Sequence, residues 1–348
     1  MNDNQYLTYL NLDNITVFEE LHVSFTTGIN IFIGKNGTGK THLLKILYSA
    51  CDITRTKSPF PEKLVRVFLP LGSDIGRLVR RCEEPSLGHI DIGGTSNSVS
   101  VAISNRAEDF RKLEESEIDN INYVFKNIWL SKQMECVYIP VKEMLANAPG
   151  FLSLYEFREI HFEEIYADIL RRAFRPLLKG TLDLPRKKIL EQIERCIHGK
   201  VIQKEEMLFL GNRRGNIEFT LLAEGMRKLA LLWQLIQNGT LMEGSILFWD
   251  EPEANLNPAM MGDVVDILLQ LQRLGIQIFL ATHDYVLLKE FDQRITERDS
   301  VRFHSLYEDS DSVKLNSTEQ YLEIHPNAIS ETFHTLLSNE VQRALGGH

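Results

Sequence analysis

A glycine-rich stretch, GKNGTGKT at positions 34–41, constrains this chain more than any other feature. An apolar run, INIFI, precedes it, and a helical pattern with leucines on one face follows it. This order of strand, loop and helix fits a phosphate-binding loop. There, glycines let backbone N–H groups approach a polyphosphate, and the helix start adds partial positive charge. The pattern therefore predicts nucleotide binding.

Each part of this loop has an expected role. Lys40 is expected to reach the β- and γ-phosphates of the nucleotide and to act in catalysis, and the Thr41 hydroxyl to bind Mg²⁺. The alternative is an accidental glycine-rich turn, whose chance in a chain of this length is on the order of one in a hundred. The residues expected to bind the nucleotide are Gly34, Asn36, Gly37, Thr38, Gly39, Lys40 and Thr41.

A second motif supplies carboxylates. The apolar run ILFW ends at Asp250 and Glu251, and a buried strand would deliver both to its C-terminal end, where ligands bind in open α/β sheets. Asp250 is expected to hold Mg²⁺, and Glu251 to polarise the attacking water. The alternative is a strand followed by a solvated acidic turn.

A third motif follows the run IQIFLA, which ends at Thr282 and His283. A histidine at the end of the neighbouring strand can sense or bind the γ-phosphate, so His283 is expected to be catalytic. The alternative is an ordinary core or surface histidine.

The spacing of apolar runs predicts an α/β fold. Short runs at the N-terminal end indicate an antiparallel β part that leads into a central strand, and helix and strand alternate near the C-terminal end. A charged run at 106–128 reads as helical. We expect a mainly parallel core sheet assembled from 1–51 and 201–348, with 52–200 forming an inserted, mixed and largely helical lobe.

Composition limits the class of protein. No apolar run approaches the roughly 20 residues that span a bilayer, and the N-terminal residues lack a signal-peptide pattern, so we expect a cytoplasmic protein without a membrane partner. The net charge of −10 argues against a surface covered with phosphate-binding groups.

The four motifs in order are the phosphate loop, LAEGMRK at 222–228, FWDEPEANLNP and ATHD. This order resembles ATP-binding-cassette ATPases. More closely, it is similar to bacterial AAA-family proteins grouped with the structural-maintenance-of-chromosomes and overcoming-lysogenization-defect ATPases. The resemblance implies a P-loop ATPase whose two heads sandwich two ATPs, with Ala223 and Gly225 of one head facing the nucleotide of the other. The family usually has serine at Ala223, and Arg227 or Lys228 could compensate for that missing hydroxyl.

The resemblance carries further expectations. Residues 255–258 resemble the loop that signals between heads, and Lys142 and Glu143 occupy the region that couples nucleotide state to the inserted lobe. Phe18 is a candidate for stacking on adenine.

The expected function is an ATPase that dimerises on ATP and relays its nucleotide state to a partner effector, in bacterial antiphage defence. The alternative is a DNA-binding ATPase of repair or recombination. Its local support is a group of basic residues, which a solvated charged face explains more simply because Glu83 and Glu84 follow: Arg55, Lys57, Arg77, Arg80 and Arg81. A transporter motor would need a membrane partner.

Overall fold

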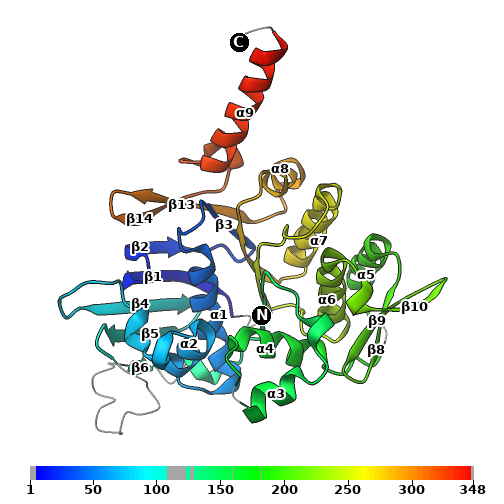
Figure 1. The fold of residues 1–348 in the computed structure, drawn as a ribbon, viewed down its shortest axis with the longest axis horizontal. Coiled ribbons are helices and arrows are strands. Elements are labelled where there is room, and N and C mark those ends of the chain that lie inside the picture. Colours follow the sequence, from blue (N-terminus) through cyan, green and yellow to red (C-terminus); the bar gives the residue numbers. More distant parts are fainter. Residues whose placement is uncertain (1–4, 108–122, 126–128, 159, 181, 346–348) are drawn as a thin grey trace.

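The computed structural model describes residues 5–107, 123–125, 129–158, 160–180 and 182–345 of the 348-residue chain. In this part of the chain the strands form an antiparallel sheet, a mainly parallel core sheet and a small three-stranded sheet (Figure 1). The mixed α/β architecture with a mostly parallel core confirms the fold class predicted from the sequence.

The antiparallel sheet has the strand order β2-β1-β4-β5-β6. Alternating apolar residues make its strands, and one face of the sheet is buried. Its strands are β1 (Leu7–Ile15), β2 (Phe18–Ser24), β4 (Leu87–Gly94), β5 (Ser98–Ser104) and β6 (Tyr123–Phe125).

The core sheet has the strand order β14-β13-β3-β12-β11-β7, and only the β13–β14 pair is antiparallel among these described strands. β12 lies between β3 and β11. The strand before the phosphate loop (β3), the strand before His283 (β12) and the strand that ends at Asp250 (β11) are therefore adjacent. The strands are β3 (Ile29–Gly34), β7 (Cys136–Ile139), β11 (Ile246–Asp250), β12 (Gln277–Thr282), β13 (Val301–Asp309) and β14 (Ser312–Thr318).

The core strands are buried on both faces, because helices or strands cover each side. On one face, Ile31, Leu247 and Ile278 pack with residues of α4 to α8. On the other face, Phe32 and Phe248 pack with α1 and with the antiparallel sheet. The continuous apolar runs of the sequence result from this double coverage.

Helices flank both faces of the core sheet (Figure 1). The small sheet lies beside α5 and α6 and consists of β8 (Lys200–Lys204), β9 (Met207–Asn212) and β10 (Gly215–Glu218). The helices are α1 (Lys40–Thr56), α2 (Phe60–Phe68), α3 (Phe151–Arg158), α4 (Glu164–Ala173), α5 (Leu184–Ile197), α6 (Glu224–Gln237), α7 (Met261–Arg273), α8 (Tyr285–Arg294) and α9 (Ala328–Ala344).

The segment 52–200, expected to be one inserted lobe, is divided between several parts of the structure. β4 pairs with β1 in the antiparallel sheet, and β7 pairs with β11 in the core sheet. The helices α2, α3, α4 and α5 lie within this segment and match the expected helical texture. The run 106–128, predicted to be helical, lies largely outside the described residues, although 123–125 forms β6.

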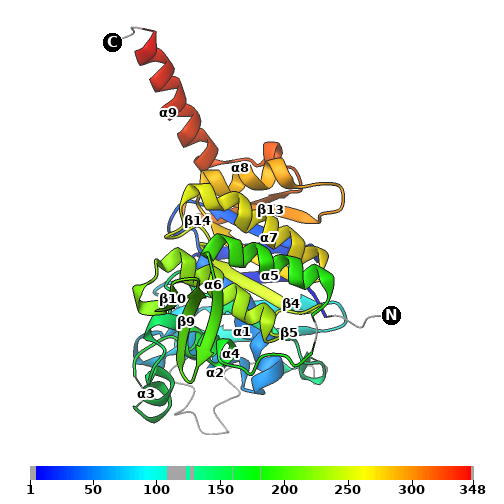
Figure 2. The same ribbon diagram turned by 90° about the vertical axis from the view of Figure 1, so that its right-hand side faces the viewer.

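Helix α9 projects away from the rest of the chain (Figure 2), and no residue within it is buried. Its base is attached through Phe333, whose ring stacks on that of Tyr285 with centroids 4.1 Å apart. None of the helices in the described part of the chain has the length and apolar character that a membrane crossing requires.

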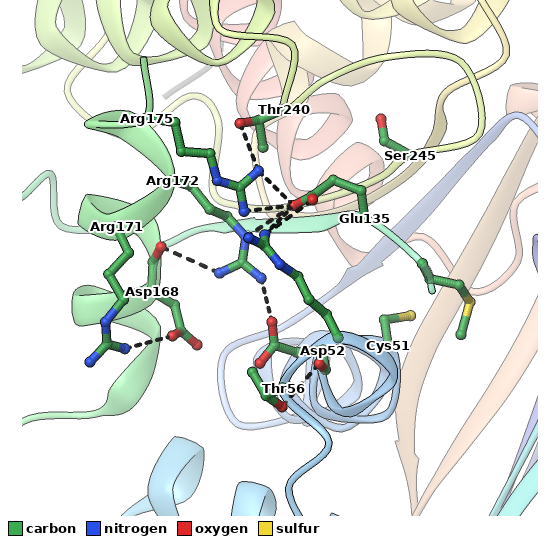
Figure 3. Close-up of polar contacts among 12 residues, drawn as sticks. Cys51, Asp52, Thr56, Glu135, Asp168, Arg171, Arg172, Arg175, Thr240 and Ser245 are labelled. Carbon is green, nitrogen blue, oxygen red and sulfur yellow. Dashed lines mark hydrogen bonds and ion pairs between the residues drawn. The ribbon is translucent and has the colours of Figure 1, made fainter. Parts of the chain in front are cut away.

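A largely buried group of charged side chains fixes α1 to its surroundings, and Figure 3 shows its members Asp52, Glu135, Asp168 and Arg172. The Lys63 ammonium from α2 lies 2.6 Å from carboxylate oxygens of both Asp52 in α1 and Asp168 in α4. Arg172 in α4 also donates to Asp52, and its Nε lies 3.6 Å from Glu135, the residue before β7. We call these five residues the α1–α4 ion cluster. It anchors the helix that begins at the phosphate loop.

Candidate nucleotide-binding site

The phosphate loop connects β3 to α1 and uses backbone conformations that favour glycine. Gly39, which precedes α1, has φ +87°, and a Cβ there would lie 2.5 Å from a ring carbon of Phe18. At Gly34, with φ +151°, a Cβ would lie 2.4 Å from the Leu306 carbonyl oxygen. A side chain at either position would therefore need both a rare backbone conformation and a displaced neighbour.

Lys40 is buried beneath this loop. Its Nζ donates to the carbonyl oxygens of Gly34 at 2.8 Å and Lys35 at 2.9 Å. Burial lowers the pKa of Lys40, and the charges of Glu251 and Asp250 offset part of that effect. The Thr38 hydroxyl donates to the Lys35 carbonyl at 2.9 Å, which braces the same turn.

The phosphate loop meets the first carboxylate directly. The Thr41 hydroxyl donates to Asp250 Oδ1 at 3.2 Å, and the Tyr138 hydroxyl donates to Oδ2 at 3.1 Å. Burial raises the pKa of Asp250, and these two hydrogen bonds oppose the shift. Both residues predicted to bind metal thus share one contact, with oxygen atoms of the type that Mg²⁺ prefers.

Glu251 and His283 also meet. The Glu251 amide donates to the Ala281 carbonyl at 2.9 Å, and its φ of +48° turns the chain sharply after β11. His283 Nδ1 lies 3.3 Å from Glu251 Oε1. The predicted base and the predicted γ-phosphate sensor therefore lie together at the C-terminal edge of the adjacent strands β11 and β12, and β12 is the direct neighbour of β3, which leads into the phosphate loop.

Sequence reasoning missed Glu253, a third acid at this edge. It is 8% exposed, and its Oε1 accepts hydrogen bonds from the Thr282 hydroxyl at 2.7 Å and the His283 amide at 3.2 Å. Burial raises the pKa of Glu253, and these bonds oppose the shift. The available signal was its position two residues after Glu251, in the sequence DEPE.

The LAEGMRK segment forms the start of α6. Ala223 is the exposed N-cap residue and makes no side-chain capping bond. Gly225 is buried against the loop that follows β11, where a Cβ would lie 2.5 Å from the Asn255 carbonyl oxygen. In the single chain, this segment therefore packs on the loop expected to signal between heads.

Arg227 and Lys228 are both directed into their own chain. Arg227 Nε donates to Glu143 Oε2 at 2.6 Å, and the buried Lys228 Nζ donates to the Ala254 carbonyl at 3.0 Å. Compensation by either residue for a missing hydroxyl toward a second head stays a prediction. They tie α6 to the loops after β7 and β11.

Glu143 links the loop after β7 to the same helix, since its amide donates to Glu224 Oε1 at 3.3 Å, whereas Lys142 is exposed. The interpretation of Phe18 as an adenine-stacking residue is wrong, because its side chain is fully buried beside Gly39. An open hollow of about 920 Å³ lies next to it, lined in part by Val17, His42, Phe68, Arg77 and Arg80.

Comparisons with known proteins agree with this geometry. Residues 9–139 match a family described as "AAA domain", and residues 138–289 match one described as "AAA domain, putative AbiEii toxin, Type IV TA system". Both matched families are AAA-domain families, and the two matches together extend over residues 9–289. A structure of an SMC head bound to the C-winged-helix domain of ScpA superposes with a TM-score of 0.52 at 12% identity, covering 90% of this chain and 98% of that one.

A second solved structure with a similar fold is the Pyrococcus furiosus SMC head with an extended coiled coil, bound to the C-terminal domain of ScpA. It has a TM-score of 0.51 at 11% identity over 96% of this chain and 99% of that one. At such identities the likeness concerns the fold.

Curated relatives match over short segments. DNA replication and repair protein RecF of Cytophaga hutchinsonii is 46% identical over 46 residues, covering 13% of this chain and 12% of that protein. Cell division ATP-binding protein FtsE of Mycobacterium tuberculosis is 36% identical over 52 residues, covering 15% of this chain and 23% of that protein. The aligned segments span less than a quarter of either relative.

Proposed function

We propose that the chain binds and hydrolyses MgATP, dimerises on ATP and relays the closed state to a protein effector. The observation that carries the proposal is the meeting of three predicted motifs at one sheet edge. Thr41 lies 3.2 Å from Asp250, and His283 lies 3.3 Å from Glu251. A coincidence of unrelated glycine, acid and histidine motifs would not bring these groups together.

The residues divide the work of phosphoryl transfer. Loop amides and Lys40 grip the phosphates once its ammonium exchanges carbonyl contacts for phosphate oxygens. Thr41 and Asp250 would hold Mg²⁺, which neutralises charge on the phosphates when bound. Glu251 orients and deprotonates the attacking water, and His283 sits against Glu251, where it responds to charge on the γ-phosphate.

The open hollow beside the phosphate loop can receive the nucleoside of ATP. The open hollow reaches His42, the residue after Thr41, and includes the apolar side chains Val17 and Phe68 together with several arginines. An aromatic and apolar wall with cations suits a base and a ribose next to an anionic tail. We assign the adenosine end of ATP to this hollow.

Dimerisation would complete the site in a second copy. α6 begins with the exposed Ala223, and the amides of its first turn have no helical partner. These groups suit the γ-phosphate held by another head. The contacts of Lys228 and Arg227 connect the same helix to the loops after β11 and β7. A movement of α6 on closure with a second head would therefore displace the loop after β11, which contains Glu251.

A protein effector in bacterial defence is the favoured setting. The family description of residues 138–289 names a toxin of a toxin–antitoxin system. The structural relative with a TM-score of 0.52 is an SMC head bound to a protein domain. These support a nucleotide-driven relay between proteins.

The second candidate is an ATPase that acts on DNA, favoured by the RecF relatives. Several of the basic residues that would contact DNA instead form hydrogen bonds within their own chain. Arg55 donates to Glu135 at 3.1 Å, Lys57 to the Leu130 carbonyl at 2.5 Å, and Arg80 to the Asp311 carbonyl at 2.6 Å. This favours the protein relay.

The test compares ATP turnover and oligomeric state with and without double-stranded DNA. The relay predicts ATP-dependent dimers whose turnover does not respond to DNA. Stimulation by DNA that falls steeply with salt would support the repair function instead. Absence of ATP hydrolysis in the chain, alone and with its genomic neighbour's product, would contradict both.

A further inference from the structure

We propose that Glu253 is a positioning residue that holds the Thr282–His283 turn so that the His283 imidazole meets Glu251. This inference rests on the proposed function of the same site. Glu253 follows β11, whereas Thr282 is the last residue of β12 and His283 follows it, so the Glu253 carboxylate bridges the ends of two parallel strands. It does not touch the phosphate loop in the contacts of the described residues.

One oxygen of Glu253 organises the whole turn. Oε1 accepts from the Thr282 hydroxyl at 2.7 Å and from the His283 amide at 3.2 Å, and it lies 3.9 Å from His283 Nδ1. The Thr282 hydroxyl in turn accepts from the Asp284 amide at 3.0 Å. Glu253 thereby fixes Thr282 and His283 directly, and it fixes Asp284 through the Thr282 hydroxyl.

The backbone contact determines where the imidazole lies. With its amide held by Glu253, His283 directs Nδ1 toward Glu251 Oε1 at 3.3 Å, and both carboxylates lie on the Nδ1 side of the ring. A carboxylate accepts hydrogen bonds, so this geometry places a proton on Nδ1. Glu253 therefore sets both the ring orientation and the nitrogen that carries the proton.

The burial of the Glu253 carboxylate lowers the stability of the fold, which argues against a purely structural role for this residue. Its side chain is 7% exposed, and among the described residues no donor reaches its buried Oε2. A buried carboxylate with a free oxygen is destabilising, and an apolar residue would avoid that cost. An acid in this position is expected where a function depends on it.

The first test measures the His283 ring without nucleotide. Two-bond ¹⁵N–¹H NMR spectra of ¹⁵N-histidine-labelled full-length chain distinguish the two neutral tautomers, and His283→Gln identifies the signal among the ten histidines. We expect the Nδ1–H form in the wild type and a mixture of both forms in Glu253→Ala. Exchange of the His283 amide with solvent should accelerate in the same variant.

The second test is a double-mutant cycle on ATP turnover. Glu253→Ala is expected to lower kcat by about 10- to 100-fold with a smaller change in KM, as for other residues that orient a reacting group. Glu253→Gln keeps an acceptor for both donors and should lose less. In a His283→Ala background, Glu253→Ala should cause no further loss, because its effect acts through His283.

The outcomes separate this inference from the proposed function. Unchanged His283 tautomer and amide exchange in both Glu253 variants would overturn the positioning role, whatever the chain hydrolyses. Additive losses in the cycle would overturn it while leaving the ATPase function intact. A wild type without turnover would contradict the proposed function. The NMR measurement would still decide whether Glu253 determines the tautomer of the His283 imidazole.

Discussion

Two buried groups of charged residues each include a residue of α1, Lys40 at its start and Asp52 in its C-terminal half, and their pKa values respond to burial in opposite ways. The α1–α4 ion cluster contains Asp52 and Lys63, and the candidate site contains Lys40, Asp250 and Glu253. All five are less than 9% exposed. The difference between the groups lies in whether opposite charges within the chain compensate the loss of water.

At Asp52 and Lys63 of the ion cluster, the effect of partner charges on the pKa exceeds the effect of burial. Burial would raise the pKa of Asp52, yet Lys63 and Arg172 hold it below its ordinary value. Burial would likewise lower the pKa of Lys63, and Asp168, Asp52 and Glu164 raise it instead. Asp52 and Lys63 are therefore stabilised in their charged forms, as expected of a structural anchor. At the edge of the cluster, burial raises the pKa of the partly exposed Glu135 despite its arginine partners.

In the candidate site, burial prevails. The pKa of Lys40 is lowered and those of Asp250 and Glu253 are raised, despite nearby opposite charges and hydrogen bonds. These charged forms are therefore poorly compensated by the chain alone. Phosphate oxygens for Lys40 and a divalent cation for Asp250 would provide the compensation, so the contrast distinguishes a site that receives a charged ligand from one that is complete.

The largest expected effect tests the functional side of this comparison. Glu251→Gln should lower ATP turnover by about 100- to 10,000-fold because it removes the general base. ATP binding should persist, and dimers should accumulate in size-exclusion chromatography with ATP. Asp309→Asn, at an exposed position late in the chain, is the matched control. Turnover at the wild-type rate in Glu251→Gln would remove this residue from its role.

The next effect tests the structural side. Asp52→Asn leaves Lys63 and Arg172 with a buried partner that lacks charge, so we expect a loss of about 3–5 kcal/mol in the free energy of unfolding. Asp250→Asn should leave the stability of nucleotide-free protein unchanged or slightly higher, since it removes an uncompensated buried charge. Urea denaturation measures both. Equal destabilisation by the two variants would invalidate the contrast.

The pH dependence should also differ in sign. Because its folded pKa is lowered, Asp52 contributes stability that is present above its unfolded pKa and is lost as pH falls through the lower folded pKa. Glu253, whose folded pKa is raised, makes stability rise as pH falls from its folded toward its unfolded pKa. In denaturation between pH 7 and pH 4, Glu253→Gln should lack this gain. A gain equal to that of the wild type would contradict the assignment.

The smallest expected effect concerns the link between α6 and Glu251. Lys228→Met removes the donor to the Ala254 carbonyl, and burial already lowers the pKa of Lys228. We expect a stability change of about 1 kcal/mol and a fall in turnover well below that of Glu251→Gln. ATP binding to the separate heads should be unchanged. A loss of turnover as large as that of Glu251→Gln would mean that Lys228 acts directly on the nucleotide.

The sequence predicted the parts of this molecule that depend on local pattern. The apolar runs before Gly34, Asp250 and His283 are strands because each is buried on both faces, and a run of that kind is visible without a structure. The rule that ligands bind at the carboxyl ends of parallel strands then predicted that Thr41 and Asp250 lie close together.

The remainder depends on contacts between distant segments. Phe18 is buried because Gly39 packs on its ring, and Arg227 turns inward because Glu143 lies 84 positions away in sequence but 2.6 Å away in space. The split of 52–200 between two sheets reflects long-range strand pairing, which alternation of residues does not encode. Glu253 was overlooked since its role depends on the end of the neighbouring strand.

The most direct test of the account is the binding of MgATP to the nucleotide-free chain by isothermal titration calorimetry, with Lys40→Ala and an EDTA-treated sample alongside. We predict one ATP per chain for the wild type, weaker binding without magnesium, and a loss of measurable affinity in Lys40→Ala. Absence of binding to the wild type, or equal affinity in the wild type and Lys40→Ala, would contradict the account.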